Sequence, residues 1–355
     1  MKPLVSILIA AYNSEKWIRY TLRSAIAQTW PRKEIIVVND GSTDRTPDLV
    51  RQFASQGVVM VSTENRGLCA AQNLAYQSSS GDYIQWLDSD DILALDKIER
   101  QLYALKETHS KRVLLSSPYA PFYYRTSAAK FVRSSLCEDL SPLEWLLRKL
   151  SENLFMQNAT WLVSRELTDA AGPWDTRLHF DQDGEYFARV LLGSEGTRFV
   201  PGTGIYYRMS PSNRVSYIGK SNKKKDSLLM TMKLHIQYIR SLEDSDRVRQ
   251  ACLSYLGVWY DNFYPDRPDI VAEVQKLATE LGGSLEPPRL RWKYAWIRPV
   301  LGWDRAKLAQ RAIPDLKASF LRYFDRLIFN IEEARSKTAE VSSQSAALAA
   351  KETVS

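Results

Sequence analysis

Three carboxylates stand close together directly after a short apolar stretch. Tyr83 to Leu87 has the composition of a buried strand, and Asp88-Ser89-Asp90-Asp91 follows it without a break. Carboxylates this close repel one another and lose solvation on burial, unless a cation compensates their charge. Mg²⁺ and Mn²⁺ prefer oxygen ligands of this kind, and they often take their remaining ligands from substrate phosphates and water. The cluster therefore predicts a metal–diphosphate site, and an acidic turn that caps a helix from Ile92 is the structural alternative.

A second group of acidic residues stands at the start of a helix pattern. The segment runs His179-Phe180-Asp181-Gln182-Asp183-Gly184-Glu185, and apolar residues then recur at helical spacing up to Leu191. A reaction in which a hydroxyl attacks needs a base that takes up the hydroxyl proton. An aspartate at a helix start within a cleft is suited to this task, and a simple helix cap is the structural alternative.

Both acidic groups depend on neighbouring elements for their position. Over the first hundred residues, predicted strands at 5–10, 34–38, 58–61 and 81–87 alternate with helix patterns. This alternation predicts βαβ units with right-handed crossovers, and therefore an α/β fold around a mainly parallel sheet. The continuous apolar run of the first strand indicates that it is buried on both faces.

Each predicted strand ends in polar residues. The four turns are Tyr12-Asn13, Asn39-Asp40, Glu64-Asn65-Arg66 and the acidic cluster that begins at Asp88. Ligands of open α/β sheets bind outside the carboxyl ends of the strands, so we expect these turns to line one site. Helix capping is the alternative and accounts well for Asn13. Asp40 is suited either to accepting hydrogen bonds from a base or ribose, or to forming a turn before Gly41.

The middle of the chain carries further elements. A capping box at Ser141 predicts a helix start, residues 158–163 have the pattern of a strand, and residues 165–171 that of a short helix closed by Gly172. The segment 202–208 ends on Arg208. This arginine belongs either to a cationic loop that closes over a diphosphate or to a solvated polar loop.

The composition is that of a globular protein of about two domains. Of the 355 residues, 45% are hydrophobic and 25% are charged, which suffices for a sizeable core. The net charge of +7 suits a phosphorylated substrate, a polyanion or an anionic membrane, and selects none of them. The three cysteines are far apart and indicate free thiols, and no apolar run approaches the roughly 18 residues that span a bilayer. We interpret the apolar run from Leu4 to Ala11 as a strand rather than as part of a signal peptide.

Four successive segments resemble the family 2 glycosyltransferases, which have the GT-A fold. They are AAYNSEKWIRYTLRSAIAQTW, VVNDGSTDRT, ENRGLCAAQNLAY and GDYIQWLDSDD, and the resemblance extends from about Val5 to Tyr217. It implies Mn²⁺ or Mg²⁺ as cofactor, with Asp90 as the direct ligand and Asp88 near the metal or the ribose. It also implies a nucleotide site lined by Ala10, Tyr12, Asp40, Asn65, Arg66 and Asp88.

The resemblance also assigns the base. In the family, a Glu-Asp pair that follows a Gly-x-x-Asp segment supplies it, and this chain has Gly172-Pro173-Trp174-Asp175 and then Gln182-Asp183. Asp183 therefore matches the base. Gln182 stands where a Glu is usual, which leaves Asp181 as the second candidate. As in relatives, the loop with Arg208 would close over the diphosphate.

These observations predict a metal-dependent, inverting glycosyltransferase. It would move one sugar from a nucleotide-sugar, with a UDP-sugar favoured, to a hydroxyl of a glycan or lipid-linked acceptor. Processive members carry a Q-x-x-R-W type motif, and here Pro288 stands at the Gln position before Arg291-Trp292, so we expect single-sugar transfer. The alternatives are an inactive GT-A-fold protein that binds carbohydrate or nucleotide, and a nucleotidyltransferase. The latter needs a glycine-rich phosphate loop, which residues 10–14 do not provide.

The sequence predicts three regions. They are a GT-A catalytic domain at 1–220, with its nucleotide-binding half up to about 92 and its acceptor half at 93–220, a helical region at 221–335, and a disordered tail at 336–355. Between Arg289 and Arg305, basic residues alternate with tryptophans. This pattern suits a membrane–water interface, single-stranded nucleic acid or packing on the catalytic domain. We predict a cytoplasmic protein that associates weakly with the cytoplasmic membrane face and has no nucleic-acid partner.

Overall fold

The computed structural model describes residues 2–106, 110–209, 218–219, 221–264, 266–286, 299 and 319–334. These residues belong to two compact units. The first comprises Met1–Pro121 and Lys130–Pro288, and the second comprises Phe122–Ala129 and Arg289–Ser355.

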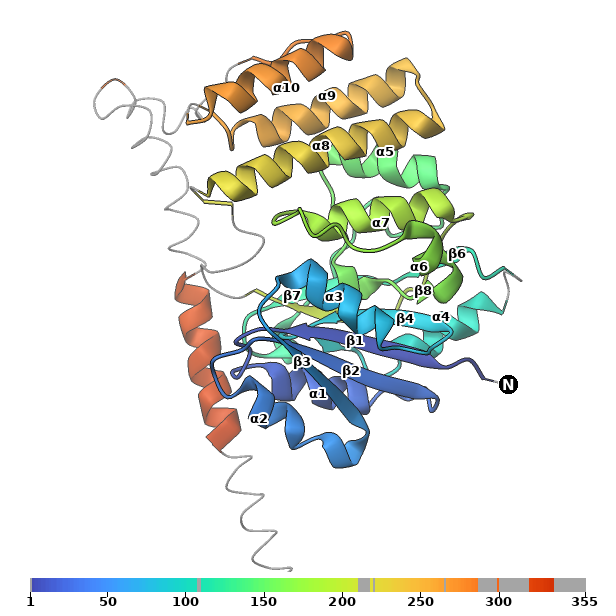
Figure 1. The fold of residues 1–355 in the computed structure, drawn as a ribbon, viewed down its shortest axis with the longest axis vertical. Helices are drawn as coiled ribbons and strands as arrows, with labels where there is room; N and C mark the ends of the chain where they lie inside the picture. The colour runs from blue at the N-terminus through green and yellow to red at the C-terminus, as the bar shows by residue number, and fades with distance from the viewer. Residues whose placement is uncertain are drawn as a thin grey trace, which may run out of the picture. The chain divides into compact units, whose positions relative to one another are not determined.

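A five-stranded sheet forms the centre of the first unit (Figure 1). Its strands are β1 (Val5–Ala11), β2 (Lys33–Asp40), β3 (Val58–Thr63), β4 (Tyr83–Asp88) and β8 (Val163–Ser164), in the order β3-β2-β1-β4-β8. The first four strands are parallel, as predicted, and β8 is antiparallel to β4. All four polar turns that follow the parallel strands therefore lie at one edge of the sheet.

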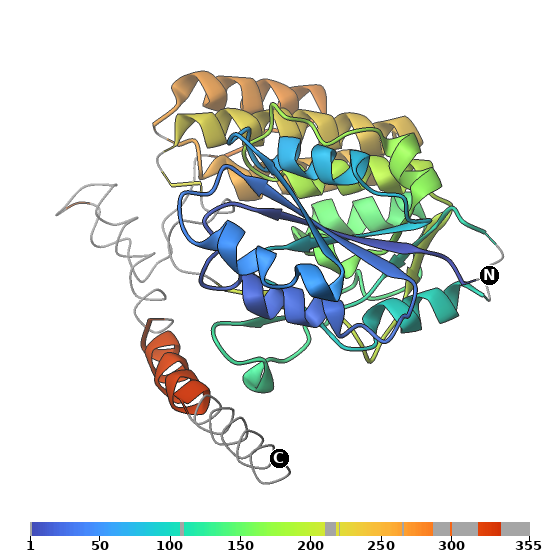
Figure 2. The same ribbon diagram turned by 60° about the horizontal axis from the view of Figure 1, so that its bottom comes forward.

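Both faces of the sheet are covered, which explains the continuous apolar run of β1. Leu8 packs in one apolar cluster, whereas Ile7 and Ile9 pack in the other, because successive side chains of a strand point to opposite faces. Helices α1 (Ile18–Ile26) and α2 (Thr46–Arg51) cover one face, and α3 (Leu68–Gln77) covers the other (Figures 1 and 2).

The elements after β4 complete the first unit around the sheet. Two small sheets add to the main one, and three helices pack beside them. One sheet has three strands in the order β5 (Ile92–Leu93), β10 (Ile205–Arg208) and β7 (Tyr119–Phe122). The other pairs β6 (Val113–Ser116) with β9 (Gly196–Phe199). The helices are α4 (Lys97–Leu105), α6 (Arg165–Ala171) and α7 (Gln182–Gly193).

The strand predicted at 158–163 is mostly wrong. A 3-10 turn, η3 (Asn158–Thr160), occupies its first half, and only Val163 belongs to a strand. The Gln157 side chain accepts a hydrogen bond from Ala159 N over 2.6 Å, which stabilises the turn. As a result, Gln157 and Asn158 face the acidic cluster.

Four helices form a layer that closes the first unit at one end (Figure 1). They are α5 (Pro142–Glu152), α8 (Asn222–Leu242), α9 (Asp246–Tyr260) and α10 (Pro268–Glu280). The predicted capping box begins α5, because Ser141 Oγ accepts from Glu144 N over 3.3 Å.

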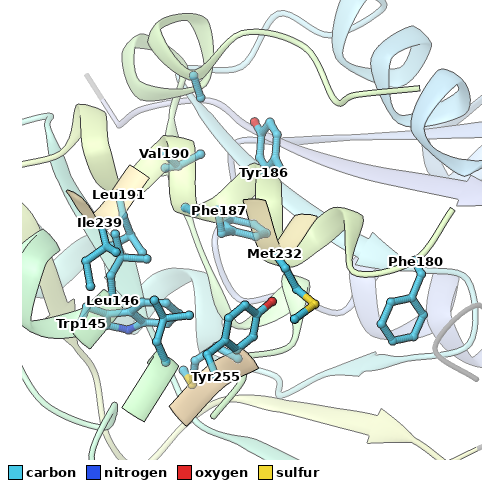
Figure 3. Close-up of a cluster of buried hydrophobic side chains, with 14 of the residues drawn as sticks. Trp145, Leu146, Phe180, Tyr186, Phe187, Val190, Leu191, Met232, Ile239 and Tyr255 are labelled. Carbon is cyan, nitrogen blue, oxygen red and sulfur yellow. The ribbon is translucent and has the colours of Figure 1, made fainter. Parts of the chain in front are cut away.

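Buried side chains join these helices to α7 in one apolar cluster. Figure 3 shows Trp145 and Leu146 of α5 beside Met232 of α8, Tyr255 of α9 and Phe187 of α7. Helices α8 to α10 therefore belong to the same compact unit as the sheet, and the boundary predicted at residue 220 does not separate two units.

The second unit pairs a loop with a helix. Arg125 forms an ion pair with Asp325 at 2.8 Å, and Asp325 also accepts from Tyr124 N over 2.8 Å. Helix 319–334 lies within the helical region predicted at 221–335, and it exposes apolar side chains such as Phe320 and Ile331. The predicted tail at 336–355 and the basic, tryptophan-rich stretch at 289–305 lie almost entirely outside the described residues.

In the part of the chain that the structure describes, every helix is too short or too polar to cross a lipid bilayer.

Candidate active site

The turns after the parallel strands are joined to one another by hydrogen bonds. After β1, Asn13 N donates to Ser42 Oγ over 3.0 Å, and Asn13 Oδ1 accepts from Thr43 N over 2.8 Å. Ser14 Oγ lies 2.7 Å from Ser89 Oγ, which belongs to the acidic turn after β4. The convergence expected from the sheet topology is therefore present for the turns after β1, β2 and β4.

Asp40 holds the turn after β3 to the end of β2. Its two carboxylate oxygens accept from Arg66 N over 2.8 Å and from Gly67 N over 2.9 Å. Gly67 has a φ of 90°, which side-chain-bearing residues rarely adopt. Asp40 is buried and thus shapes the edge of the candidate site, and its contact with a base or ribose stays a prediction.

The other predicted nucleotide-binding residues present accessible groups along this edge. Tyr12 is 51% exposed, and the side chains of Asn65 and Arg66 are exposed as well. Ala10 of β1 is paired with Asp88 of β4, so both residues lie at the carboxyl-terminal edge of the sheet. These positions are compatible with a nucleotide that lies across the turns.

Two side-chain amides hold Asp88. Asn158 Nδ2 donates to Asp88 Oδ1 over 2.8 Å, and Gln157 Nε2 lies 3.1 Å from Asp88 Oδ2. Burial, followed by the nearby charge of Asp90, raises the pKa of Asp88 to about 7. The folded protein thus concentrates acceptor oxygens here at an electrostatic cost, which a bound cation would offset.

Asp91 stabilises the turn through hydrogen bonds that its buried side chain accepts. It is completely buried, and its oxygens accept from Arg208 N and Gln157 Nε2, both over 2.7 Å. Burial and the charges of Asp90 and Asp88 raise the pKa of Asp91 well above its ordinary value. Asp91 is therefore a structural carboxyl group of the turn.

Arg208 lies at the end of β10 and not in the loop that the sequence suggested. Its Nε donates to Asp90 O over 2.7 Å, and its guanidinium lies 3.8 Å from the centre of the Trp17 ring. The side chain is buried, so in this structure it braces the backbone of the acidic turn. The loop at 210–217 lies outside the described residues, and a contact between Arg208 and a diphosphate stays a prediction.

Asp183 lies in the first turn of α7. Burial, followed by the charge of Asp181, raises the pKa of Asp183 to about 6. The charge of Asp183 is also one of the lesser causes of the raised pKa of Asp88, although almost a hundred residues separate the two in the sequence. That the two acidic groups act in one site stays a prediction.

The acidic turn suits a divalent ion that shares its coordination with a substrate. Within the described ranges, no group of three or more His, Cys, Asp or Glu residues is arranged to hold a metal. With Asp91 occupied by hydrogen bonds within the turn, Asp88 and Asp90 are the two candidate ligands, and their oxygens match the preference of Mn²⁺ and Mg²⁺. Such a site is complete only when phosphate oxygens supply further ligands.

Sequence reasoning missed Gln157, Asn158 and Trp17 as parts of the site. Trp17 stands in an ordinary amphipathic pattern, and the two amides precede an apolar run that resembles a strand. The one available signal was that Gln157-Asn158 offers two amides next to a predicted buried strand, where polar side chains need partners.

Comparison with known proteins agrees with this geometry. Residues 6–131 match Glycosyl transferase family 2. An uncharacterized glycosyltransferase of Rickettsia typhi is 31% identical over 189 residues, which are 53% of this chain and 59% of that protein. The Bacillus subtilis protein named "Putative teichuronic acid biosynthesis glycosyltransferase TuaG" is 38% identical over 109 residues, 30% of this chain and 43% of that protein.

Solved structures show the same fold. Residues 1–349 of Staphylococcus aureus TarS in complex with UDP-GlcNAc superpose with a TM-score of 0.64 at 17% identity, covering 78% of this chain and 81% of that chain. The mannosyltransferase PcManGT of Pyrobaculum calidifontis, in complex with GDP-Man and Mn²⁺, gives a TM-score of 0.50 at 16% identity, with 79% and 85% covered.

The fold is therefore of the GT-A type, and residues 6–131 of the chain match the model of Glycosyl transferase family 2. The chain spans less than two thirds of the length of these curated relatives. The matched segment covers 59% of the Rickettsia typhi protein and 56% of the Rickettsia prowazekii protein.

Proposed function

We propose that this protein is a metal-dependent, inverting glycosyltransferase that moves one sugar from a nucleotide-sugar to an acceptor hydroxyl. The observation that carries the proposal is the acidic turn at the carboxyl edge of a GT-A sheet, where Asn158 and Gln157 form hydrogen bonds with Asp88. This turn is suited to a metal–diphosphate, and Asp183, whose pKa is raised by burial to about 6, is suited to proton uptake.

The two acidic groups divide the chemistry between them. Asp90 and Asp88 would hold Mn²⁺ or Mg²⁺, which neutralises the charge that develops on the leaving nucleoside diphosphate. Asp183 would take the proton of the acceptor hydroxyl as its oxygen attacks the sugar carbon from the side opposite the diphosphate, so the configuration inverts. Tyr12, Asn65 and Arg66 present exposed side chains to the nucleotide along the same edge.

A UDP-sugar is the favoured donor. TarS, whose structure holds UDP-GlcNAc, superposes better than PcManGT, whose structure holds GDP-Man, with TM-scores of 0.64 and 0.50. The proposed acceptor is a hydroxyl of a glycan or of a lipid-linked saccharide, and the relative TuaG is named for teichuronic acid biosynthesis. We place the reaction in the cytoplasm, with weak association at the membrane face.

Hydrolysis and transfer assays with a panel of UDP-, GDP- and dTDP-sugars test the proposal. We expect slow, Mn²⁺-stimulated release of the nucleoside diphosphate from one donor, and its loss when a chelator is added. Binding of a nucleotide-sugar without any turnover would favour an inactive GT-A-fold binding protein. Release of pyrophosphate from a nucleoside triphosphate and a sugar phosphate would favour a nucleotidyltransferase.

A further inference from the structure

Three successive carbonyl oxygens, those of residues 159–161, accept hydrogen bonds from side chains of other elements. Gln85 Nε2 donates to the first of these oxygens over 2.9 Å. Gln101 Nε2 donates to the second over 3.0 Å, and Lys97 Nζ donates to the third over 3.2 Å. Residues 159–161 are completely buried, and buried carbonyl groups need such donors.

The three donors are themselves completely buried, although Gln and Lys seldom lie in a protein core. Lys97 is the least expected of them, because burial of an ammonium group is costly. Its Nζ donates to two neutral oxygens, Gln85 Oε1 and the carbonyl oxygen of residue 161, and burial lowers the pKa of Lys97 well below its usual range. A lysine at such a position needs a reason beyond the filling of space.

The donors lie on the elements that flank the acidic turn in the chain. Gln85 belongs to β4, which ends at Asp88, and Lys97 and Gln101 belong to α4, the first helix after the turn. The oxygens that they bond belong to a segment that is distant in the chain. The network therefore joins both sides of the acidic turn to residues 159–161.

The two amides that bond the acidic turn stand directly before these carbonyl groups. Asn158 Nδ2 donates to Asp88 Oδ1 over 2.8 Å, and Gln157 Nε2 donates to Asp91 Oδ2 over 2.7 Å. Because Asn158 is adjacent to the bonded segment, a shift of residues 159–161 would move both amides relative to the carboxylates. The donors that hold this segment thereby hold the amides against the turn.

We propose that Gln85, Lys97 and Gln101 are positioning residues for the candidate metal site. By holding the segment after Asn158, they keep its amide on Asp88 and so fix the orientation of a carboxylate that would bind Mn²⁺ or Mg²⁺. The inference rests on the proposed function, since it concerns the metal ligand assigned there. Loss of a hydrogen-bond partner of a metal ligand commonly lowers metal affinity by about 10- to 100-fold, and these three side chains act one contact farther from the ion.

Two buried glutamines that contact α4 or belong to it provide a matched pair of variants. Gln101→Leu removes a donor to residues 159–161, whereas Gln28→Leu removes a donor to Ala94 O, which is bonded over 2.7 Å. Gln28 is 3% exposed, and its Oε1 accepts from Ile98 N of α4 over 3.3 Å. A general loss of polar contacts around α4 would therefore affect both variants alike, and Gln101→Leu alone of the pair loosens the segment.

Lys97→Met is the second test variant. It is needed because Gln101 Nε2 also donates to Ser117 Oγ over 2.9 Å, so that Gln101→Leu changes two contacts. Methionine keeps the length of the lysine side chain and removes its donor. Thermal melting establishes that each variant is folded, and Gln101→Asn, which shortens the side chain but keeps its polarity, replaces the two variants if neither folds.

The first measurement is NMR of the full chain without any ligand, in which side-chain amide signals report the hydrogen bonds of Asn158. Asn158→Leu identifies the signal by its loss. We expect the ¹H and ¹⁵N shifts of this amide to move toward those of an exposed amide in Gln101→Leu and Lys97→Met, and to keep their wild-type values in Gln28→Leu. Unchanged shifts in both test variants, or equal changes in Gln28→Leu, would overturn the inference.

The second measurement is the binding of Mn²⁺ in the presence of UDP, followed by isothermal titration calorimetry. We expect the affinity for Mn²⁺ to fall by about 10-fold in Gln101→Leu and Lys97→Met and to stay unchanged in Gln28→Leu. In an Asn158→Leu background, Gln101→Leu should lower the affinity by less than it does in the wild type, because it acts through that amide. Full additivity of the two changes would contradict the inference.

The outcomes separate this inference from the proposed function. A wild-type protein that binds no Mn²⁺ together with UDP would refute the metal-dependent reaction, and the positioning role with it. Wild-type binding that Gln101→Leu and Lys97→Met leave unchanged would refute the positioning role alone.

Discussion

Asn158 Nδ2 donates a hydrogen bond to Asp88 Oδ1 over 2.8 Å, although 70 positions separate the two residues in the chain. The neighbouring Gln157 bonds both Asp88 and Asp91, so two amides hold the carboxylates of the acidic turn. These amides make burial of the turn tolerable, because a buried carboxyl group without hydrogen bonds is destabilising. The hydrogen bonds that stabilise the candidate metal site therefore come from the protein itself.

Removal of the Asp90 carboxylate should abolish metal-dependent nucleotide binding. We expect Asp90→Ala to keep its fold and to lose Mn²⁺-stimulated affinity for UDP, because the ion loses its direct ligand. Isothermal titration calorimetry with and without Mn²⁺ measures this effect. Asp48→Ala is the control, since Asp48 lies on the surface of α2 and pairs only with Arg51 among the contacts described. Unchanged affinity in Asp90→Ala would refute the assignment.

Removal of the base should slow transfer while donor binding persists. Asp183→Asn keeps the shape of the side chain but accepts no proton, so kcat should fall by roughly 10²–10⁴-fold. The wild-type rate should also fall as the pH drops through about 6, because the base must be deprotonated and its pKa is raised to that value. A mild effect of Asp183→Asn together with a severe effect of Asp181→Asn would transfer the role to Asp181.

Loss of the Gln157 amide should destabilise the protein. Gln157→Leu leaves Asp91 without one of its hydrogen bonds at a completely buried position. We expect the free energy of unfolding to fall by roughly 1–3 kcal/mol, which is the usual cost of an unsatisfied buried polar group. Urea denaturation measures it, and Gln52→Leu on the surface is the control. A loss below about 0.5 kcal/mol would show that the amide does not support the turn.

A chain that ends at residue 220 should not fold stably. It lacks α8 and α9, and would expose buried side chains of α5 and α7 such as Trp145, Leu146 and Phe187. A chain that ends at residue 288 keeps these helices and should remain folded and monodisperse. Size-exclusion chromatography and thermal melting distinguish the two. A cooperative melt of the shorter chain would restore the boundary predicted from the sequence.

The stretch from Arg289 to Arg305 should confer weak, salt-sensitive membrane association. Each basic residue near an anionic surface contributes about 1 kcal/mol, and this attraction is screened by salt. We expect flotation with anionic liposomes at low salt and none with neutral ones at high salt. The comparison variant changes Trp292, Tyr294, Trp296 and Trp303 to alanine. Equal flotation of that variant, or no flotation of the wild type, would rule the association out.

The sequence by itself determined the sheet and the place of the acidic turn. Apolar runs of strand length that alternate with helix patterns specify a parallel sheet, and the carboxyl ends of parallel strands share one edge. Asp88, Asp90, Asp40 and Tyr12 could therefore be assigned to one region from local patterns alone. The observed strands β1 to β4 contain the predicted segments almost to the residue.

Only the tertiary structure decided what surrounds these carboxylates. It shows Gln157 and Asn158 as the hydrogen-bond donors to the turn and Arg208 as a brace stacked on Trp17. Hydrophobic periodicity reports which face of an element is buried, but it does not report which distant element covers that face. Contacts between residues that lie far apart in the chain depend on the packing of whole helices and turns, and that packing is settled only when the complete chain folds.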